Sequence, residues 1–476
     1  MIPAQKFLPC VACLLLAGCL GRVGPDYQPP STPDIARFAA ANDAAAFLSD
    51  PTPTQWWRVL NDARLNRLVE RALESNNDVK VAQANLRAAR AALAAQRGGL
   101  FPQLNAGAAY ARTRPAAAAQ GVSAVAADAD SFDAGFDASW ELDVFGRVSR
   151  SVEAATASAA AAEARLDDMR VSIAADTARA YVDLRGAQQR LNVARRNAEN
   201  QKGTYELTVQ LSEGGRGSDL DVARARAQYE TTLAGIASLE AAEDSARFRL
   251  AVLTGDPPST IDQSAQDYEA PAPEIPRVPE TVAIGDPASM LRQRPDIRAA
   301  EREVAAATAR IGVATADLFP RIDLIGSIGL SALGGDLFND DAAFRFAAGP
   351  SLSWTVFAGG RVRALVEQAD AQAAAQLARY DAVVLAALED AENALSRYSR
   401  ERIRFGNLTA AADASARAAD LAEQRYRGGV DSFLNVLDAQ RSLLASEDAA
   451  VQSQIATTTQ FIAIYKALGL GWSASP

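Results

Sequence analysis

The side chains that most often carry chemistry in proteins are scarce in this sequence. All three cysteines, Cys10, Cys13 and Cys19, lie near the N-terminus, and histidine is absent from all 476 positions. Without histidine there is no Ser-His-Asp triad and no imidazole metal site. Without a later cysteine there is no disulfide framework, zinc cluster or thiol nucleophile. Carboxylates are plentiful, but no spacing of them marks a pocket, so we expect no enzyme activity, no catalytic residue and no bound metal.

Cys19 is the one cysteine whose setting suggests a reaction. Residues 7–16 form an apolar run that is too short to span a bilayer and is typical of a secretory signal peptide. The run leads into the string LAGC, which ends at Cys19 and resembles the lipobox of bacterial lipoproteins. That resemblance implies cleavage of residues 1–18 as a signal peptide and attachment of diacylglycerol and palmitate to Cys19. Leu20 follows Cys19 at the position where an Asp would typically retain a lipoprotein in the inner membrane. The resemblance therefore implies localisation to the outer membrane. The alternative is an ordinary secretory signal with an accidental cysteine.

Charge and composition limit the partners and the fold. The net charge of −10 argues against nucleic acid or an anionic lipid surface as a main partner. Apolar residues make up 49% of the chain and aromatic residues only 7%, with alanine the dominant apolar type. Because alanine has the highest helix propensity and little bulk, this composition favours long helices packed closely side by side. An acidic chain that encloses a water path would favour cations.

The chain contains one sequence pattern twice. LFPQL at 100–104 recurs as LFPRI at 318–322, SW at 139–140 recurs at 353–354, GGRGSDLDV at 214–222 recurs as GGVDSFLNV at 428–436, and LTG at 253–255 recurs as LGL at 468–470. The order is the same and the spacing is nearly constant, which indicates duplication of one structural unit. We predict a Pro-rich extended tether over 19–61, a first repeat over 62–255, a linker over 256–286, a second repeat over 287–470 and a tail over 471–476.

Each repeat is predicted to contain the same elements in the same order. A first helix, over 62–97 or 287–318, ends at a Phe-Pro pair, after which the chain changes direction. Two strands, a long helix and a shorter helix follow. The predicted strands are 103–114, 131–145, 320–332 and 343–357, and the long and shorter helices are 148–211, 220–253, 362–427 and 433–468.

The predicted strands alternate between apolar and polar residues. In 131–145 the even positions include Phe132, Phe136 and Trp140, whereas the odd positions include Asp133 and Asp137. Long strands with one apolar and one polar face fit an outer-membrane barrel. Trp140 and Trp354 lie near corresponding strand ends, where an aromatic belt at a membrane interface would place them. The alternative is a soluble sandwich with an apolar core.

Four strands cannot close a membrane barrel, because an open edge in lipid leaves backbone groups unpaired. Two chains would supply eight strands and three would supply twelve, and the geometry alone prefers neither.

Residues 148–211 and 362–427 contain no proline, and each would form a helix of roughly 95–100 Å. We expect the two shorter helices of each repeat to stack end to end beside the long one, giving four rods per chain. A coiled-coil spacer would explain the helices but not the strands, the duplication or the lipobox.

In combination these features resemble the TolC-like outer membrane factors, and within them the NodT/OprM-like lipoprotein branch. The resemblance rests on the LAGC string, GPDY at 24–27, the twin Phe-Pro sites, Trp140 to Gly146, SDLDVARARAQY at 218–229, RYRGGVDS at 425–432 and VLDAQR at 436–441. It implies an α+β membrane protein that forms a homotrimer, with a twelve-stranded transmembrane β-barrel, four strands per chain, continued by a long periplasmic barrel of twelve helical rods. The family is not enzymatic.

The resemblance also assigns roles to residues near the two Gly-rich turns. Residues at a periplasmic gate or constriction would be Asp221, Tyr426, Asp431, Asn435 and Asp438. Residues at helix tips that contact the adaptor would be Gly214, Gly215, Arg216, Gly428, Gly429 and Val430. Asn435 replaces an acidic residue that is found in some relatives. Asp431 stands where some relatives have an Arg that bonds a neighbouring helix, so the interhelical bond made by that Arg is in doubt here. The alternative for each gate position is a solvated charge beside a helix turn.

The function implied is that of an outer-membrane exit channel in a tripartite efflux system. It would passively conduct drugs and toxic small molecules received from an inner-membrane RND pump through a periplasmic adaptor, the membrane fusion protein. The alternatives are an exit duct for type I protein secretion and a structural outer-membrane lipoprotein spacer. Relatives in protein secretion usually lack the lipobox, which favours efflux. The sequence does not identify the cargo.

Overall fold

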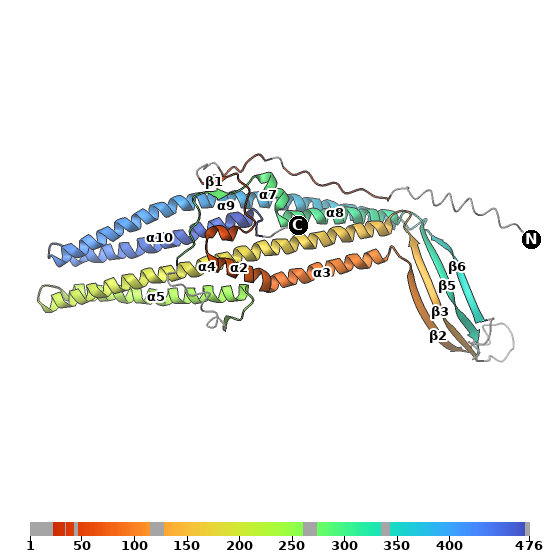
Figure 1. The fold of residues 1–476 in the computed structure, drawn as a ribbon, viewed down its shortest axis with the longest axis horizontal. Helices are drawn as coiled ribbons and strands as arrows, with labels where there is room; N and C mark the ends of the chain where they lie inside the picture. Colours follow the sequence, from red (N-terminus) through yellow and green to blue (C-terminus); the bar gives the residue numbers. More distant parts are fainter. Residues whose placement is uncertain are drawn as a thin grey trace, which may run out of the picture. The chain divides into compact units, whose positions relative to one another are not determined.

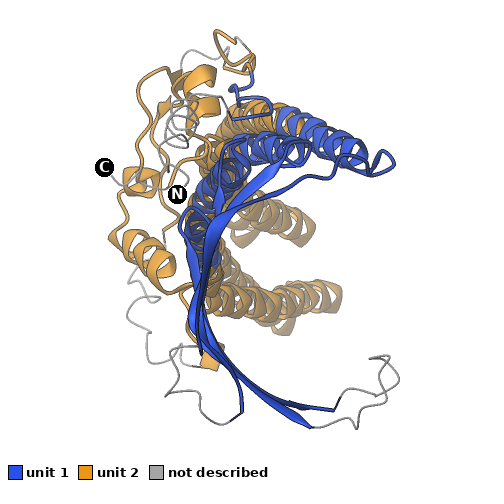
Figure 2. Ribbon diagram, turned by 90° about the vertical axis from the view of Figure 1, so that its right-hand side faces the viewer, with its two compact units in different colours: residues 1–30, 85–163, 299–381 blue, residues 31–84, 164–298, 382–476 orange. Residues whose placement is uncertain are grey.

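In a computed structural model of the chain, residues 22–33, 35–41, 46–114, 128–259, 274–334 and 343–471 are described. The predicted signal peptide and Cys19 lie outside these residues. The chain forms two compact units (Figure 2), which we call the strand unit (residues 1–30, 85–163 and 299–381) and the helix unit (residues 31–84, 164–298 and 382–476). Each unit takes segments from both predicted repeats, so the compact units cut across the sequence repeats. The reason is that a repeat built on one very long helix has no compact core of its own.

The strand unit contains a four-stranded antiparallel sheet (Figure 1). Its strands are β2 (Gln103–Thr113), β3 (Ala129–Leu142), β5 (Arg321–Leu333) and β6 (Phe344–Ser353), in the spatial order β2-β3-β5-β6. The central pair places Ser131 opposite Leu333 and Leu142 opposite Ile322. Among the described residues, β2 and β6 are therefore the outer strands.

β3 ends three residues before the end predicted from the alternation. The Asp143 carboxylate accepts the backbone N–H groups of Val148 (2.8 Å) and Ser149 (2.7 Å) at the start of the next helix. Gly146 adopts a φ of 79° within this turn, which a residue with a side chain rarely adopts. Residues 143–145 therefore continue the period-two pattern in sequence but serve as a helix cap in the structure.

Long helices and their shorter partners have the same lengths in both repeats. α4 (Arg147–Glu213) and α9 (Arg361–Arg427) each contain 67 residues, a rise of about 100 Å. α5 (Asp219–Leu253) and α10 (Phe433–Ala467) each contain 35 residues. All four lie 214 positions from their counterpart in the other repeat. Within the described part of the chain, no helix is both long enough and apolar enough to cross a membrane.

The first helix of each repeat is two helices rather than the single one predicted. The pairs are α2 (Ala63–Ser75) with α3 (Asn77–Gly98), and α7 (Pro287–Gln293) with α8 (Pro295–Ala316). Asn76 has extended backbone angles, and its side-chain oxygen accepts the N–H of Asp78 (2.8 Å), which restarts the helix. Arg294 precedes Pro295, and a residue before proline is disfavoured in the helical region.

These breaks hold the ends of the shorter helices within the helix unit. The Asn76 amide donates to the carbonyl oxygen of Leu253 at the end of α5 (3.0 Å), and Arg294 donates to that of Ala467 at the end of α10 (2.6 Å). Asn76 and Arg294 are quasi-equivalent, as are Leu253 and Ala467. The start of α3 thus meets the end of α5, which is the end-to-end arrangement expected from the helix lengths.

Irregular segments pack against both units. In the strand unit, buried Arg150 donates to the carbonyls of Val23 and Gly24 and pairs with Asp26 at 2.8 Å. In the helix unit, the short 3-10 helix η1 (Trp56–Leu60) stacks Trp56 on Tyr465, with ring centroids 5.7 Å apart. β1 (Phe47–Leu48) pairs with β4 (Val282–Ala283) as a two-stranded parallel sheet. Within the predicted tether, the described residues Val23, Gly24 and Asp26, the strand Phe47–Leu48 and Trp56 are thus bound by backbone and side-chain contacts.

Candidate functional site: the hairpin tips and the strand sheet

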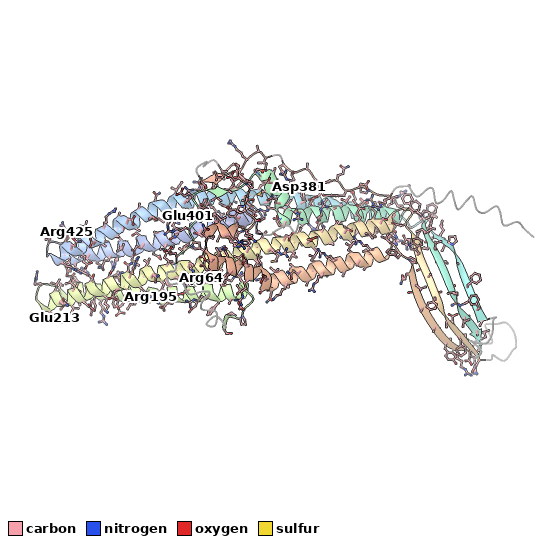
Figure 3. The ribbon with its side chains drawn as sticks, in the orientation of Figure 1. Arg64, Arg195, Glu213, Asp381, Glu401 and Arg425 are labelled. Carbon is pink, nitrogen blue, oxygen red and sulfur yellow. The ribbon has the colours of Figure 1, made fainter. Side chains whose placement is uncertain are left out.

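The two helical hairpins of the helix unit end in turns with one hydrogen-bond pattern. Gly215 and Gly429, with φ of 69° and 66°, each follow a glycine at the end of the long helix. The N–H groups of Arg216 and Val430 reach back to the carbonyls of Leu211 (2.8 Å) and Arg425 (3.0 Å). Such a turn requires a residue that tolerates positive φ, which explains the paired glycines. The six residues predicted to contact an adaptor therefore lie at the exposed ends of the hairpins, close to Glu213 and Arg425 in Figure 3.

A small apolar cluster joins the two hairpins just behind their tips. Its buried members are Ala225, Phe433, Val436 and Leu437, and Tyr205, Ala422 and Tyr426 pack against it. Two polar contacts reinforce the junction. Gln440 on α10 donates to the Thr204 hydroxyl on α4 (2.8 Å), and Arg441 donates to Gln228 on α5 (2.7 Å).

Two of the predicted gate residues, from different hairpins, interact electrostatically at this junction. Tyr426 on α9 is partly buried, and its ring lies 5.6 Å from that of Phe433. Burial, and secondly the charge of Asp221 on α5, raise the pKa of Tyr426 above its usual value of 10. The phenol therefore stays neutral across the physiological range beside an acidic side chain.

Asp431 and Asn435 instead form bonds within their own hairpin. The Asp431 carboxylate accepts the N–H of Ser432 (2.9 Å), the amide of Asn435 (2.5 Å) and Nε of Arg425 (3.1 Å). These three hydrogen bonds lower the pKa of Asp431. We call this group the tip clamp. Some relatives have an Arg at this position that bonds a neighbouring helix, and Asp431 instead bonds residues of its own hairpin. Arg425 is a member of the tip clamp that the sequence analysis missed.

Asp438 lies one helical turn beyond Asn435 on α10, and both side chains are exposed. Phe433, Val436 and Leu437 on the same helix face the apolar cluster instead. The spacing therefore puts the polar pair on one face of α10 and the buried residues on another.

The two tryptophans predicted to form an aromatic belt have equivalent anchoring bonds. Nε1 of Trp140 donates to the carbonyl of Leu100, and Nε1 of Trp354 donates to that of Leu318, both at 3.1 Å. Leu100 and Leu318 precede the twin Phe-Pro pairs. Each indole is therefore fixed to the turn that leads into the neighbouring strand, a contact that the sequence alone did not reveal.

One face of the strand sheet is apolar and open. By the register of all three strand pairs, even-numbered residues of the four strands share this face. Phe136 is 52% exposed, Ile328 51% and Phe346 74%. The exposed large side chains of this apolar face are Leu104, Tyr110, Phe136, Leu324, Ile328, Phe344, Phe346 and Leu352. A continuous patch of this kind marks a surface that is covered by a partner or by lipid.

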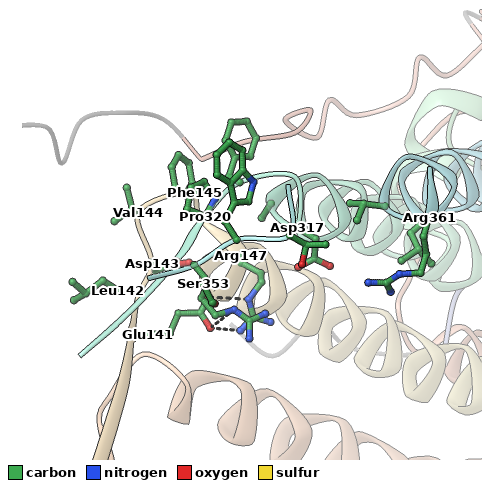
Figure 4. A pocket seen from close by; sticks show the side chains of 17 residues that line it. Glu141, Leu142, Asp143, Val144, Phe145, Arg147, Asp317, Pro320, Ser353 and Arg361 are labelled. Atoms are coloured by element: carbon green, nitrogen blue, oxygen red, sulfur yellow. Dashed lines mark hydrogen bonds and ion pairs between the residues drawn. The ribbon is translucent and has the colours of Figure 1, made fainter. Parts of the chain in front are cut away.

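The opposite face of the sheet carries charges. Asp133 pairs with Arg345 on β6 at 2.8 Å. At the end of the sheet, Glu141 binds Arg147, with a second contact to Arg321 at 3.8 Å. Glu141, Arg147 and Arg321 line a cavity of about 350 Å³ shown in Figure 4. A sheet with one apolar face and one charged face is the arrangement found where strands separate lipid from water.

Comparisons with known proteins place the chain among bacterial outer-membrane proteins. The model of the family described as outer membrane efflux protein matches residues 68–256 and 287–470, one match in each half of the chain. Nodulation protein T of Rhizobium leguminosarum bv. trifolii is 32% identical over 466 residues, which cover 97% of this chain and 96% of that protein. Outer membrane protein OprJ of Pseudomonas aeruginosa is 32% identical over 475 residues, with 97% and 96% covered. A solved structure described as the outer-membrane channel OprN has a TM-score of 0.86 and 40% identity, and covers 94% of this chain and 98% of that chain.

Proposed function

The chain belongs to the outer membrane efflux protein family, and from this we propose that it is the outer-membrane exit channel of a tripartite efflux system. It passively conducts small toxic molecules that an inner-membrane RND pump delivers through a periplasmic adaptor. The observation that carries the proposal is the family match in both halves of the chain. The sheet supports the proposal independently, because one of its faces is apolar and the opposite face carries charges. A membrane pore needs an apolar face toward lipid and a polar face toward water.

We propose that the working channel is a homotrimer. Four strands with two outer edges cannot seal a pore in lipid, so other chains must complete the sheet. Three copies supply the twelve strands and twelve rods expected from the family resemblance, and twelve strands leave room for a water path. Crosslinking followed by mass measurement in mild detergent tests this assignment, and a stable monomer would contradict it.

The gate is assigned to the region behind the hairpin tips. Tyr426 and Asp221 hold the two hairpins together near the closed end, and three copies of Asp438 and Asn435 line the constriction. Carboxylates that face a common axis attract cations. Replacement of Asp438 and Asn435 by Ala should therefore weaken the cation preference of the channel, and an unchanged reversal potential in a salt gradient would remove both residues from the constriction. The exposed glycine turns are assigned to adaptor contact.

The membrane anchor is assigned to diacylglycerol and palmitate on Cys19. Residues 22–27, which follow closely, are bound to the strand unit through Arg150 and through a 2.8 Å hydrogen bond from Tyr27 to Glu301. A lipid on Cys19 would therefore stay close to the sheet. Cys19→Ser should abolish incorporation of radiolabelled palmitate, and persistent labelling would contradict the anchor.

Deletion of the gene tests the physiological role. A strain without the protein should become more susceptible to antibiotics, dyes and detergents, and the wild-type gene should restore resistance. Loss of a secreted protein with unchanged susceptibility would instead assign the channel to type I secretion. Envelope defects without either change would indicate a structural spacer.

A further inference from the structure

One cavity of the strand unit lies where the sheet meets the helices. Its volume of about 350 Å³ falls in the usual range for small-molecule sites. The lining comes from the ends of β3, β6 and α8, the start of β5 and the starts of α4 and α9. Three carboxylates and three guanidinium groups belong to this lining, those of Glu141, Asp143, Asp317, Arg147, Arg321 and Arg361. The cavity therefore suits a charged ligand, and the contacts of these six groups decide which kind.

Four of the six charged groups are engaged within the chain. The Glu141 carboxylate accepts two hydrogen bonds from Arg147, one of them from Nε at 2.8 Å, and lies 3.8 Å from Arg321. The Asp143 carboxylate accepts two backbone N–H groups at the start of α4, where a negative charge is stabilised. A ligand would have to break these contacts to reach the four groups, so they form the fixed part of the cavity wall.

The other two groups, Asp317 and Arg361, form no ion pair and no side-chain hydrogen bond within the described part of the chain. Asp317 follows α8 and acts through space on Arg147 without forming an ion pair with it. Arg361 is the first residue of α9. Both side chains are exposed, and Figure 4 shows the Arg361 guanidinium directed toward Asp317. One acidic and one basic group thus face the same cavity with their hydrogen-bonding capacity unused.

The duplicated sequence shows how the second repeat differs from the first at this cavity. The string ELDVFGR at 141–147 corresponds to TVFAGGR at 355–361 in the second repeat. The arginine is kept, whereas the two carboxylates that precede it are replaced by threonine and phenylalanine. Asp317 conversely stands where the first repeat has Gly99. The second repeat therefore keeps the guanidinium group, lacks the carboxylate that binds it in the first repeat, and adds a carboxylate elsewhere on the cavity wall.

We propose that this cavity binds small zwitterions, with a carboxylate of the ligand on Arg361 and an ammonium group on Asp317. A ligand with a single charge would be attracted by one of these side chains and repelled by the other, whereas a zwitterion is attracted by both. A guanidinium group also matches a carboxylate through two parallel hydrogen bonds. The proposal rests on the proposed function, which turns the charged face of the sheet toward the water path. It adds a class of cargo that the path can hold, small molecules with both an amino and a carboxylate group.

Saturation-transfer NMR on the purified protein in mild detergent measures binding without requiring conduction. The probes are ω-amino acids from glycine to 6-aminohexanoate, which vary the distance between the two charges, together with butyrate and butylammonium, which carry one charge each. The variants are Arg361→Gln, Asp317→Asn and the charge swap that combines Arg361→Asp with Asp317→Arg. The matched control is Arg345→Gln, which removes a guanidinium group from the same face of the sheet but outside the cavity.

At least one ω-amino acid should bind the wild-type protein more tightly than either probe of a single charge. Its affinity should fall roughly fivefold in Arg361→Gln and in Asp317→Asn, because each variant loses one exposed charge contact. The charge swap should restore binding, since a zwitterion can bind in the reverse orientation, and Arg345→Gln should match the wild type. Restoration by the swap separates a direct contact from a general effect of either substitution on the fold.

Equal affinity for the ω-amino acids in the wild type and in both single variants would overturn the site. Butyrate that binds as tightly as the amino acids, and is weakened only by Arg361→Gln, would overturn the zwitterion in favour of a simple anion. Current recordings in lipid bilayers separate these results from the proposed function. A protein that conducts but binds no ω-amino acid overturns the site alone, whereas a protein that binds but never conducts supports the site and contradicts the exit channel.

Discussion

At the scale of residues, the tips are organised by contacts that span the turns. The tip clamp joins Arg425 to Asp431 across the Gly428-Gly429 turn, and a separation of six positions with glycines between gives no pattern in the sequence. The paired glycines themselves were predictable, because a tight turn after a helix requires positive φ. Sequence analysis therefore located the tips but not the partners of Asp431.

Removal of the tip clamp should loosen the start of α10. Asp431→Ala deletes the acceptor for the N–H of Ser432 and the partner of Asn435. Hydrogen exchange at residues 432–435 should become several-fold faster at neutral pH. Because the Asp431 pKa is lowered in the folded state, its contribution is present above the ordinary carboxyl pKa and is lost as the pH falls through the lowered value. Asp438→Ala, an exposed change on the same helix, serves as the control, and equal exchange in the two variants would contradict the clamp.

The electrostatic effect of Asp221 on Tyr426 should be visible in the alkaline titration. Asp221→Asn removes a nearby negative charge, so the pKa of Tyr426 should fall toward 10. A tyrosine whose pKa is raised in the folded state contributes stability below pH 10 that is lost as the pH rises through the raised value. Carbon NMR of labelled tyrosine measures the shift, and an unchanged Tyr426 titration would show that the charge of Asp221 does not act on Tyr426.

At the scale of elements, periodicity predicted most of the fold and failed at its interruptions. The four strands were visible because alternation separates Phe132 and Phe136 from Asp133 and Asp137. Asp143 continues that alternation but caps α4, so the sequence pattern runs past the strand. The breaks at Asn76 and Arg294 were missed. The break at Arg294 had a local signal in Pro295, whereas the hydrogen bonds from these two side chains to the ends of α5 and α10 have no signal in the sequence.

Asn76 is the side chain on which one of these breaks depends. Asn76→Ala removes the cap of α3 and leaves the buried carbonyl of Leu253 without its donor, at a cost of about 2–3 kcal/mol. The thermal unfolding midpoint should fall, and hydrogen exchange should rise at the start of α3 and the end of α5. Asn77→Ala, an exposed neighbour, is the matched control. Equal midpoints for the two variants would show that Asn76 does not hold the break.

At the scale of the whole molecule, the chain carries surfaces that it does not itself cover. The apolar sheet face and the exposed residues Leu233, Val252 and Ile403 have no counterpart buried against them among the described residues. The duplication was evident from strings such as GGRGSDLDV and GGVDSFLNV, whereas the exposure of Leu233, Val252 and Ile403 is known only from the structure. Sequence alone predicted that copies assemble, and that assembly stays a prediction.

The most direct test of the channel function is the conductance of the purified, signal-free protein in a planar lipid bilayer. Insertion should produce discrete current steps that prefer cations over anions, because carboxylates outnumber guanidinium groups on the polar sheet face. That face carries Asp133, Asp137, Glu141 and Asp323 against Arg321 and Arg345. Tyr426→Ala with Asp221→Ala, which weakens the junction behind the tips, should lengthen the open periods. Stable bilayers that contain the folded protein and the double variant but never conduct would contradict the exit-channel function.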